Sequence, residues 1–338
     1  MNYKINKPTI KDVAKKSNVS IATVSRILNN LDGYSEDTRK KVLDIMDEIG
    51  YQRNAVARNL KVKETRTIGV LLPRVSTTYY VEILNGIEDF AHLNNYSVII
   101  CNVGINGESN LEYLSVLSER QVDGIIVCSL PPKDEFCKKV IEAHIPTIFV
   151  STLSYRYSIP YVKVDDYQAA YSATCYLIEN GHKKIAMLGG AKDDIIAEVP
   201  RLNGFIQALK DNNIPIKENL IKEKGFSFRE GVEGMEELLK ENEKFTAIFA
   251  SCDDSAVGAL SVAHKRGIKI PEDISIIGYD NTNIAEMAYP PLTTVGQPLY
   301  EMGKKSVEML IKRISLNEKV ESIIMPFEIV ERETVKKI

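Results

Sequence analysis

Apolar residues at helical spacing mark the first short helix near the start of the chain. Thr9 followed three residues later by Asp12 predicts a helix start with a hydroxyl cap and an acid in the first turn. Val13 and Ala14 are its inward positions, and the pattern ends at about Ser17.

A second helix follows after a tight turn at residues 18–19. Ser20 is its predicted cap, and the apolar residues behind it recur on one face. The inward positions are Val24, Ile27 and Leu28.

A third helix is predicted from Ser35 to Gly50, with two acids in its first turn and a glycine stop. Its inward positions are Val42, Ile45, Met46 and Ile49. Two short helices joined by a turn and supported by a third form a helix-turn-helix, whose second helix enters the DNA major groove. The alternative is a small helical bundle that binds no nucleic acid. Residues 51–60 argue against it, because a segment this short is not stable as an isolated helix, yet it carries two arginines and ends on Leu60.

From Thr67 the pattern changes to short apolar strands that alternate with amphipathic helices. Strands are expected at 68–72, 97–101, 124–128, 146–150, 184–188, 245–249 and 274–279. Helices are expected at 80–93, 111–119, 168–180, 202–211 and 255–265, with one more between the third and fourth strands. Continuous apolar strands bounded by helices predict parallel sheets covered on both faces, and the repeat of the pattern predicts two similar α/β lobes. Ligands of such sheets bind at the carboxyl ends of the strands, so a cleft between the lobes is the expected binding site.

The segments TIKDVAKKSNVSIATVSRILN (residues 9–29) and NAVARNL (residues 54–60) resemble the lactose-repressor/galactose-repressor family of bacterial transcription regulators. The resemblance is dense over residues 9–60 and continues through the rest of the chain. It implies an α/β body with two lobes like those of periplasmic binding proteins, parallel sheets flanked by helices, and an all-α helix-turn-helix head.

The same resemblance implies a division of the chain. The head is residues 1–50 and the hinge helix with its linker residues 51–65. One lobe comprises residues 66–164 plus 292–325, and the other residues 165–291 plus 326–338. The chain is expected to cross between the lobes near Val164, near Pro290–Pro291 and near Pro326.

Charge and composition agree with this division. Residues 1–66 carry 14 Lys and Arg against 8 Asp and Glu, whereas the remainder carries 29 against 38. A basic head on an acidic body suits a phosphate-binding module attached to a sensing body. The five cysteines are scattered without metal-ligand spacing, which indicates buried free thiols in a reducing cytoplasm, and no metal or cofactor is expected. The sequence shows no signal peptide and no apolar run near 18 residues, so no membrane contact is expected.

The predicted DNA contacts fall into two groups. Polar residues that can reach phosphates set the register, and residues at the start of the second helix read bases. The phosphate group is Thr9, Ser20, Thr23 and Asn29, and the family base-reading positions are Ile21, Ala22 and Arg26. The first two base-reading residues offer only apolar contact, for example to a thymine methyl, whereas Arg26 can pair with guanine or, as the alternative, contact a phosphate.

Leu60 resembles the hinge-helix leucine that wedges into a central base step from the minor groove. The alternative is a linker residue that packs against the body. Small residues before it, among them Ala57, allow two hinge helices to lie against each other. The resemblance therefore implies a homodimer on double-stranded, pseudo-palindromic operator DNA.

The effector residues implied by the resemblance follow predicted strands. Arg201 in RLNGF and Asp280 in GYDN would contact polar groups of the effector; the alternatives are a salt bridge between them or a loop cap at Asp280. Phe226 would be an aromatic platform or else a plain core residue. The other candidates are Ser76, Tyr79 and Tyr80 after the first strand, Ser151 after IPTIFV, and Asp253, for which helix capping is the favoured role.

Two departures from the family bear on the ligand. Many relatives carry an aspartate where this chain has Ser151, so one acceptor for a sugar hydroxyl is absent. Purine-sensing relatives use a tryptophan nearby, and this chain has none. We therefore expect a repressor of carbohydrate-utilisation genes controlled by a small sugar or sugar phosphate, with a purine- or nucleoside-responsive repressor as the alternative.

Other functions are less favoured. Residues 295–310 resemble the region where some catabolite-control relatives bind a phosphorylated carrier protein, but Glu308 stands where an arginine cluster would be needed. An enzyme is not expected, since no nucleophile triad, P-loop or dinucleotide motif appears and the four histidines suggest surface positions. A transport receptor is disfavoured by the basic head and the lack of a signal peptide.

Overall fold

The computed structural model describes residues 8–51, 64–73, 77–104, 107–131, 133–316 and 318–338. The chain divides into two compact units, residues 1–63 and residues 64–338. The predicted hinge segment, with Ala57 and Leu60, and the candidate Ser76 lie outside the described residues.

The first unit is a three-helix head. Its helices are α1 (Ile10–Ser17), α2 (Ile21–Leu28) and α3 (Glu36–Ile49). The Thr9 N–H and hydroxyl both donate to the Asp12 carboxylate, at 2.8 and 2.7 Å, and the Ser20 hydroxyl accepts from the Thr23 N–H at 3.0 Å. Gly50 ends α3 in the left-handed conformation. These caps and boundaries confirm the three predicted helices.

The head core differs from the prediction at one helix. Its buried residues are Val13, Ala14, Val24, Ile27, Leu28 and Val42. Of the inward positions predicted on α3, only Val42 is fully buried; Met46 and Ile49 pack at the margin, and Ile45 is half-exposed. A core made by three short helices encloses few positions, so the long α3 buries only its central turn.

The second unit contains a first lobe built on a six-stranded sheet of order β11-β5-β4-β3-β1-β2. Every pairing in this sheet is parallel. The strands are β1 (Thr67–Leu72), β2 (Ser97–Asn102), β3 (Gly124–Cys128), β4 (Thr147–Val150), β5 (Tyr161–Val164) and β11 (Ile323–Met325). Helices α5 (Thr78–Leu93) and α13 (Leu299–Leu316) pack on one face, and α6 (Asn110–Glu119) and α7 (Asp134–Glu142) on the other.

The second lobe repeats this three-layer arrangement with the order β12-β10-β9-β8-β6-β7. The strands are β6 (Ile185–Gly189), β7 (Ile221–Glu223), β8 (Ala247–Ala250), β9 (Ser275–Asp280), β10 (Thr293–Gly296) and the antiparallel β12 (Glu328–Val330). Helices α8 (Asp166–Glu179) and α9 (Glu198–Asp211) cover one face, and α10 (Phe228–Leu238) and α11 (Asp253–Arg266) the other. The short α12 (Asn283–Met287) follows β9, and a 3-10 turn spans Glu218–Leu220.

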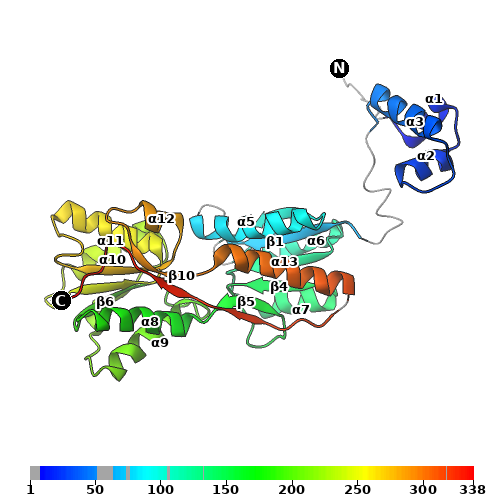
Figure 1. Cartoon of the computed structure of the whole chain (residues 1–338). Helices are drawn as coiled ribbons and strands as arrows, with labels where there is room; N and C mark the ends of the chain where they lie inside the picture. The colour runs from blue at the N-terminus through cyan, green and yellow to red at the C-terminus, as the bar shows by residue number, and fades with distance from the viewer. Residues whose placement is uncertain (1–7, 52–63, 74–76, 105–106, 132, 317) are drawn as a thin grey trace, which may run out of the picture. The chain divides into compact units, whose positions relative to one another are not determined.

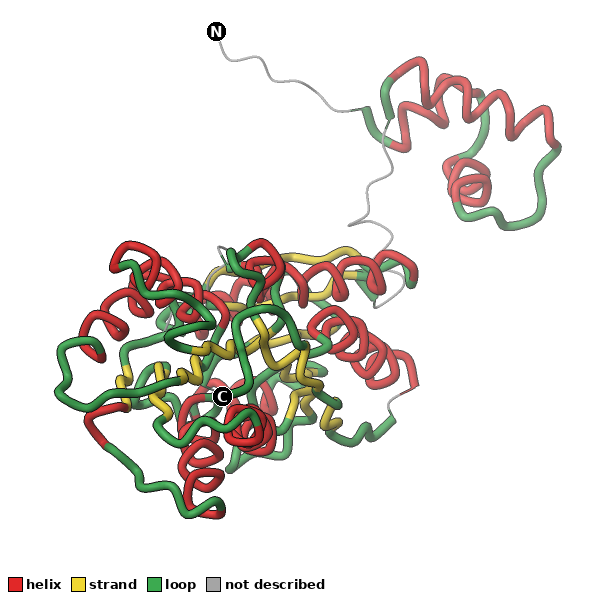
Figure 2. Tube along the Cα trace, turned by 60° about the vertical axis from the view of Figure 1, so that its left-hand side comes forward, coloured by secondary structure: helices red, strands yellow, loops and turns green. Residues whose placement is uncertain are grey.

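Each sheet is buried between its two helical layers, as the continuous apolar strands predicted (Figure 2). The edge strands β2, β7, β11 and β12 are the exceptions: each has a neighbour on one side only and is only partly buried, and Ile100 of β2 remains 40% exposed. The strands that sequence patterns missed are the short ones at sheet edges and lobe crossings, where three or four residues give too little periodicity to recognise.

The chain crosses between the lobes three times. It leaves the first sheet after Val164 and returns to the second sheet between Met325 and Glu328, near the expected positions. The crossing expected near Pro290–Pro291 is wrong in position. Strand β10 pairs with β9 in the second sheet, so the chain passes to the first lobe only after Gly296.

The prediction of surface histidines is wrong for His182, which is 1% exposed. Its ring nitrogens lie 2.9 Å from the Thr246 hydroxyl and 3.2 Å from the Lys336 carbonyl oxygen. Among the cysteines, Cys175 is half-buried, and the other four are buried free thiols. In the part of the chain that the structure describes, no helix is both long and apolar enough to cross a membrane.

Candidate functional site

The outer face of α2 carries the predicted base-reading residues. Ile21 is 46% exposed, and Ala22 and Arg26 are exposed as well, so the cap at Ser20 presents an open helix start with unpaired backbone N–H groups. The Asn29 amide donates to the Ser25 carbonyl oxygen at 2.8 Å, so it caps its own helix rather than pointing freely outward.

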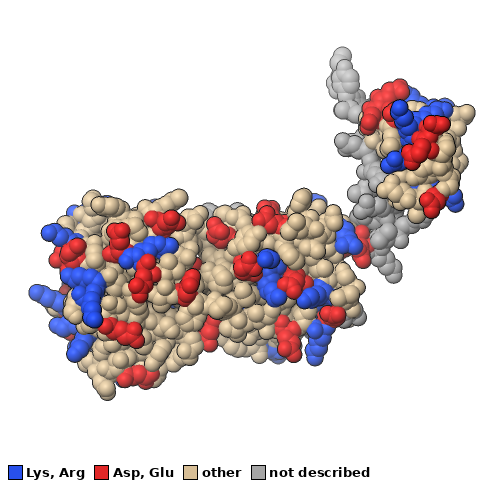
Figure 3. Space-filling model, in the orientation of Figure 1, with Lys and Arg blue, Asp and Glu red and all other residues tan. Residues whose placement is uncertain are grey.

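Gly33 explains how the Arg26 side chain is placed. Its φ of +107° lies in the region that favours glycine, and a Cβ there would stand 2.6 Å from Nη1 of Arg26. The loop after α2 therefore supports the arginine from beside the helix. On the faces shown in Figure 3, basic and acidic side chains are interspersed on both units.

A pocket of about 320 Å³ lies in the body at the carboxyl ends of strands from both sheets. Six of the predicted effector residues line it: Tyr79, Tyr80, Ser151, Arg201, Phe226 and Asp280. Their meeting follows from the fold, because parallel strands end at one edge of a sheet and the two sheets present these edges to the same cleft. Their role in binding remains a prediction.

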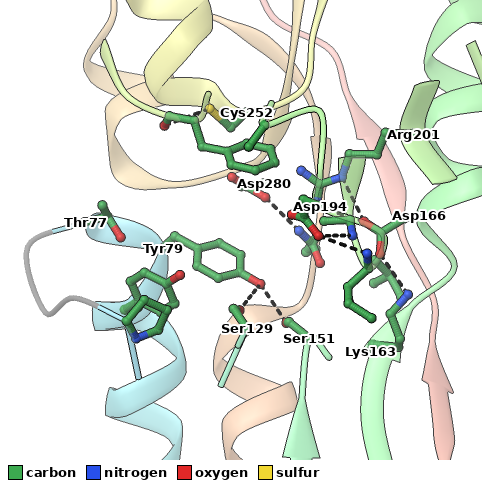
Figure 4. A pocket seen from close by; sticks show the side chains of 18 of the residues that line it. Thr77, Tyr79, Ser129, Ser151, Lys163, Asp166, Asp194, Arg201, Cys252 and Asp280 are labelled. Carbon is green, nitrogen blue, oxygen red and sulfur yellow. Dashed lines mark hydrogen bonds and ion pairs between the residues drawn. The ribbon is translucent and has the colours of Figure 1, made fainter. Parts of the chain in front are cut away.

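Apart from Lys163 at the end of β5, the described first-lobe residues that line this pocket are uncharged; they include Tyr79, Ser129 and Ser151 (Figure 4). The Tyr79 hydroxyl donates to Oγ of Ser151 at 2.6 Å and lies 3.5 Å from Oγ of Ser129. Both serines follow a strand with φ near +50°, which turns the chain sharply at the strand end. Burial raises the pKa of Tyr79 and Tyr80 well above the ordinary phenol value, so both rings stay neutral.

A buried ion network centred on Asp166, the first residue of α8, joins the two lobes at the pocket, because Lys163 belongs to β5 of the first sheet. One oxygen of Asp166 accepts from Nε and Nη2 of Arg201, at 2.9 and 2.8 Å, and the other from Nζ of Lys163 at 2.9 Å. Tyr279 donates its hydroxyl to the same carboxylate at 3.0 Å. Burial alone would raise the pKa of Asp166, but the guanidinium and ammonium groups outweigh it and hold the pKa below its usual value.

Arg201 is fixed by more than this pair. Its Nη1 donates to the Ser251 carbonyl oxygen at 2.6 Å, and its guanidinium carbon stands 3.8 Å from the centre of the Tyr279 ring. The alternative of a salt bridge between Arg201 and Asp280 is therefore wrong, because Asp166 takes the guanidinium.

Asp280 ends β9 with a φ of +117°, a backbone conformation that is costly for any residue but glycine. Nε2 of Gln297 donates to one of its oxygens at 2.7 Å. Burial, reinforced by the neighbouring Asp253, raises the pKa of Asp280 well above the ordinary carboxyl value despite Arg201. A strained backbone and a shifted pKa are both typical of functional sites. The raised pKa favours the neutral acid, whose O–H can donate a hydrogen bond in the pocket while its other oxygen accepts one.

Both roles suggested for Asp253 are wrong. Its side chain is fully buried and does not line the pocket; it accepts from the N–H and hydroxyl of Thr282, at 2.8 and 3.1 Å, and from the Thr294 hydroxyl at 2.5 Å. The helix is capped by Cys252, whose sulfur accepts from the Ser255 N–H. Asp253 therefore ties α11 to the loop after β9 rather than contacting a ligand.

Phe226 is half-buried and presents its ring to the pocket, so it is not a plain core residue. The ring covers Gly190, where a Cβ would stand 2.1 Å from a ring carbon. The Arg201 guanidinium lies 5.8 Å from the ring centre.

Several pocket residues escaped the sequence argument. They are Lys163, Asp166, Asp194, Ser129, Asp254 and Gln297. Lys163 and Asp166 flank the end of β5, and the strand-end rule would have found them had that four-residue strand been recognised. Asp194 accepts from the Ile196 and Ala197 N–H groups, at 2.9 and 3.0 Å, in a loop without regular periodicity.

Comparison with known families identifies both units. Residues 9–54 match the family described as bacterial regulatory proteins, lacI family, and residues 65–333 match the periplasmic binding proteins and sugar binding domain of the LacI family. The chain belongs to the LacI family.

Curated relatives of this LacI-family chain match over nearly their whole length. It is 39% identical to the HTH-type transcriptional regulator RegA of Clostridium saccharobutylicum, over 96% of this chain and 98% of the relative. It is 37% identical to catabolite control protein A of Priestia megaterium (97% and 99%) and 38% identical to the HTH-type transcriptional repressor PurR of Vibrio atlanticus (98% and 99%).

Solved structures agree with the sequence matches. The lac repressor dimer bound to operator and an anti-inducer gives a TM-score of 0.88 at 28% identity, over 98% of this chain and 100% of that one. The CelR–cellobiose complex gives 0.73 at 28% identity, over 97% and 100%. The protein is a DNA-binding transcriptional regulator with a small-molecule effector domain, and its relatives are regulators rather than enzymes.

Proposed function

We propose that this regulator is a homodimeric repressor of carbohydrate-utilisation genes whose effector is an uncharged sugar bound in the pocket between the lobes. The observation that carries the proposal is the charge of the pocket wall. Among the residues that the structure describes, two cations line it, Lys163 and Arg201, and both are bound to Asp166. Four further carboxyl groups line it: Asp193, Asp194, Asp254 and Asp280.

An anionic ligand does not suit this wall. A phosphate needs a free cation or a cluster of N–H donors, whereas the described lining of this pocket offers two engaged cations and an excess of carboxyl groups. We therefore favour the free sugar over the sugar phosphate. The hydroxyls of a sugar can donate to carboxylates and accept from Ser, Tyr and Gln side chains, and all of these line the pocket.

The aromatic residues support the same ligand class. Phe226 offers a flat ring to the C–H face of a sugar, with Tyr79 and Tyr80 on the opposite lobe. The CelR–cellobiose complex supports the idea that this architecture accommodates a carbohydrate.

A purine effector is the second candidate. The Phe226 ring also suits stacking on a base, and Asp280 can accept from a ring N–H. The likeness to PurR at 38% identity favours it, although the absence of tryptophan in this chain weighs against it.

Operator binding is assigned to the head. We propose that Ile21, Ala22 and Arg26 on the exposed face of α2 read bases in the major groove, with Arg26 on a guanine. Ser20 and Thr23 would set the register on phosphates together with the helix start. The proposed wedge of Leu60 rests on the sequence motif alone, as that residue lies outside the described ranges.

A homodimer needs an apolar surface on the body. Val81 on α5, Met287 on α12 and Tyr289 just after it are 41%, 81% and 94% exposed. Figure 1 shows α5, α11 and α12 along one side of the body. The lac repressor structure is a dimer, which supports a similar assembly here.

The proposed mechanism is a population shift. An effector that touches both walls favours one arrangement of the lobes, and operator DNA favours one arrangement through the paired heads. Each ligand then changes the affinity of the other by the same factor.

The test pairs a ligand panel with an operator assay. Thermal unfolding is measured with glucose and glucose 6-phosphate, ribose and ribose 5-phosphate, and hypoxanthine and adenosine, and operators are selected from random duplexes. We expect an unphosphorylated sugar to raise the Tm by several degrees and to change operator affinity. Asp280→Asn should remove the shift, whereas Glu179→Gln, on the exposed face of α8, should not.

Each other result has a defined meaning. A response confined to phosphorylated sugars would contradict the charge argument, and one confined to purines would replace the effector class. Failure to select any duplex would contradict the DNA assignment itself.

A further inference from the structure

A carboxyl group without a partner lies behind the second-lobe side of the pocket. Glu198, the first residue of α9, is 0% exposed, and neither of its oxygens has a hydrogen-bond partner. The Ser251 hydroxyl is likewise fully buried and unpartnered. An ionised carboxylate in such surroundings is unstable, so the site favours the neutral acid.

The glycine pair after β6 makes room for this carboxyl group. A Cβ at Gly189 would stand 2.4 Å from Oε1 of Glu198, and the neighbouring Gly190 lies under the Phe226 ring. The buried acid and the aromatic residue of the pocket are thus packed against the same two-residue step of the chain.

The charged groups around Glu198 come from three elements. Arg201 lies one turn further along α9, Asp194 precedes the helix, and Glu223 of β7 approaches the same glycine, its Cγ 3.5 Å from the Cβ position at Gly189. Lys163 and Asp166 lie beyond Arg201 and are bound to each other. Of the two cations named here, Arg201 is the one that shares a helix with Glu198, three residues away, where side chains on a helix can meet.

Together these groups set the pKa of the Glu198 carboxyl group near neutrality. Burial raises the pKa of Glu198 to about 7, against the opposing effects of the Gly190 N–H, Arg201 and the Ser251 hydroxyl. The N–H and the hydroxyl lie close enough to stabilise the anion weakly, but neither completes a hydrogen bond.

We propose that Glu198 is a positioning residue for the effector arginine. As a neutral acid it leaves Arg201 paired with Asp166 and stacked on Tyr279; when it releases its proton to solvent, it competes with Asp166 for the guanidinium and draws it from the pocket wall. Effector recognition is then linked to pH. This inference rests on the proposed effector role of the pocket.

The test follows the two side chains directly and needs no effector. In the full-length protein labelled with ¹⁵N-arginine and ¹³C-glutamate, the Arg201 Nε–H signal and the Glu198 carboxyl signal are recorded from pH 5.5 to 8.5. We expect one carboxyl signal to titrate near pH 7 and the Arg201 signal to shift with the same midpoint.

Two variants separate positioning from packing. Glu198→Gln keeps the shape but cannot ionise, so the Arg201 signal should lose its inflection. Glu223→Gln, on the neighbouring strand β7, should keep it.

The proposal is overturned if the wild-type Arg201 signal does not move over this range, or if it moves identically in Glu198→Gln. The wild-type titration can contradict the proposal by itself, so the test remains valid even if a variant does not fold. The ligand panel and the operator selection described above are independent of this experiment, so the proposed function and this inference can fail separately.

Discussion

Two sides of the pocket between the lobes are built from opposite chemistry. One side, formed by Tyr79, Ser129 and Ser151 of the first lobe, is uncharged, and the tyrosine hydroxyl joins the two serines. The other side is an ion network in which Asp166 of the second lobe binds Arg201 of α9 and Lys163 at the end of the first-lobe strand β5. Removing a group from the uncharged side loses one neutral hydrogen bond, whereas removing a cation from the ion network leaves the buried Asp166 with one cation instead of two.

Arg201→Met should have the largest effect on this contrast. It leaves Asp166 with one cation in a buried site, so the free energy of unfolding should fall by roughly 3–5 kcal/mol. Chemical denaturation at pH 7 measures it. Arg229→Met, at an exposed position on α10, is the control and should change stability by less than about 0.5 kcal/mol. Equal effects of the two changes would refute the contrast.

Glu198→Gln should stabilise the protein increasingly as the pH rises. The wild-type pKa is raised from 4.5 to about 7, so the acid favours folding fully below pH 4.5, and this contribution is lost as the pH rises through 7. The difference between variant and wild type should grow across this window by at most about 3 kcal/mol and then level off. Thermal unfolding at several pH values would show it; a constant difference would mean that Glu198 does not titrate there.

Lys163→Met should cost about 2 kcal/mol, because it removes one charged hydrogen bond from Asp166 but leaves Arg201. The lowered pKa of Asp166 contributes stability above its unfolded value, and this is lost as the pH falls through the folded value. With one cation fewer, acid unfolding should begin at a higher pH. If Lys163→Met and wild type begin to unfold at the same acidic pH, Arg201 alone keeps Asp166 ionised.

Tyr79→Phe should have the smallest effect, about 1 kcal/mol, since it removes one neutral hydrogen bond to Ser151. Its pH dependence should match that of wild type, because the phenol does not ionise near neutrality. A loss as large as that of Arg201→Met would abolish the distinction between the two sides of the pocket.

Local patterns in the sequence were enough for the head and for the layers of the body. The caps at Thr9, Ser20 and Ser35 and the glycine at Gly50 act within a few residues, so their effect is readable without the fold. Long apolar strands likewise predict their own burial. Short strands such as β5 and β7 escaped, and with them the start of the ion network around Lys163 and Asp166.

The strand pattern in the sequence predicted a cleft at the strand ends, and the family resemblance predicted that Arg201, Phe226 and Asp280 would lie in it; all three line the pocket. Only the tertiary structure decided their partners. Asp166 lies 35 residues from Arg201 and Asp253 lies 41 from Thr294, and contacts at such separations carry no periodic signal. Whether a carboxyl group faces a ligand, a cation or a threonine depends on the burial and geometry that two packed lobes create together, and so does its charge.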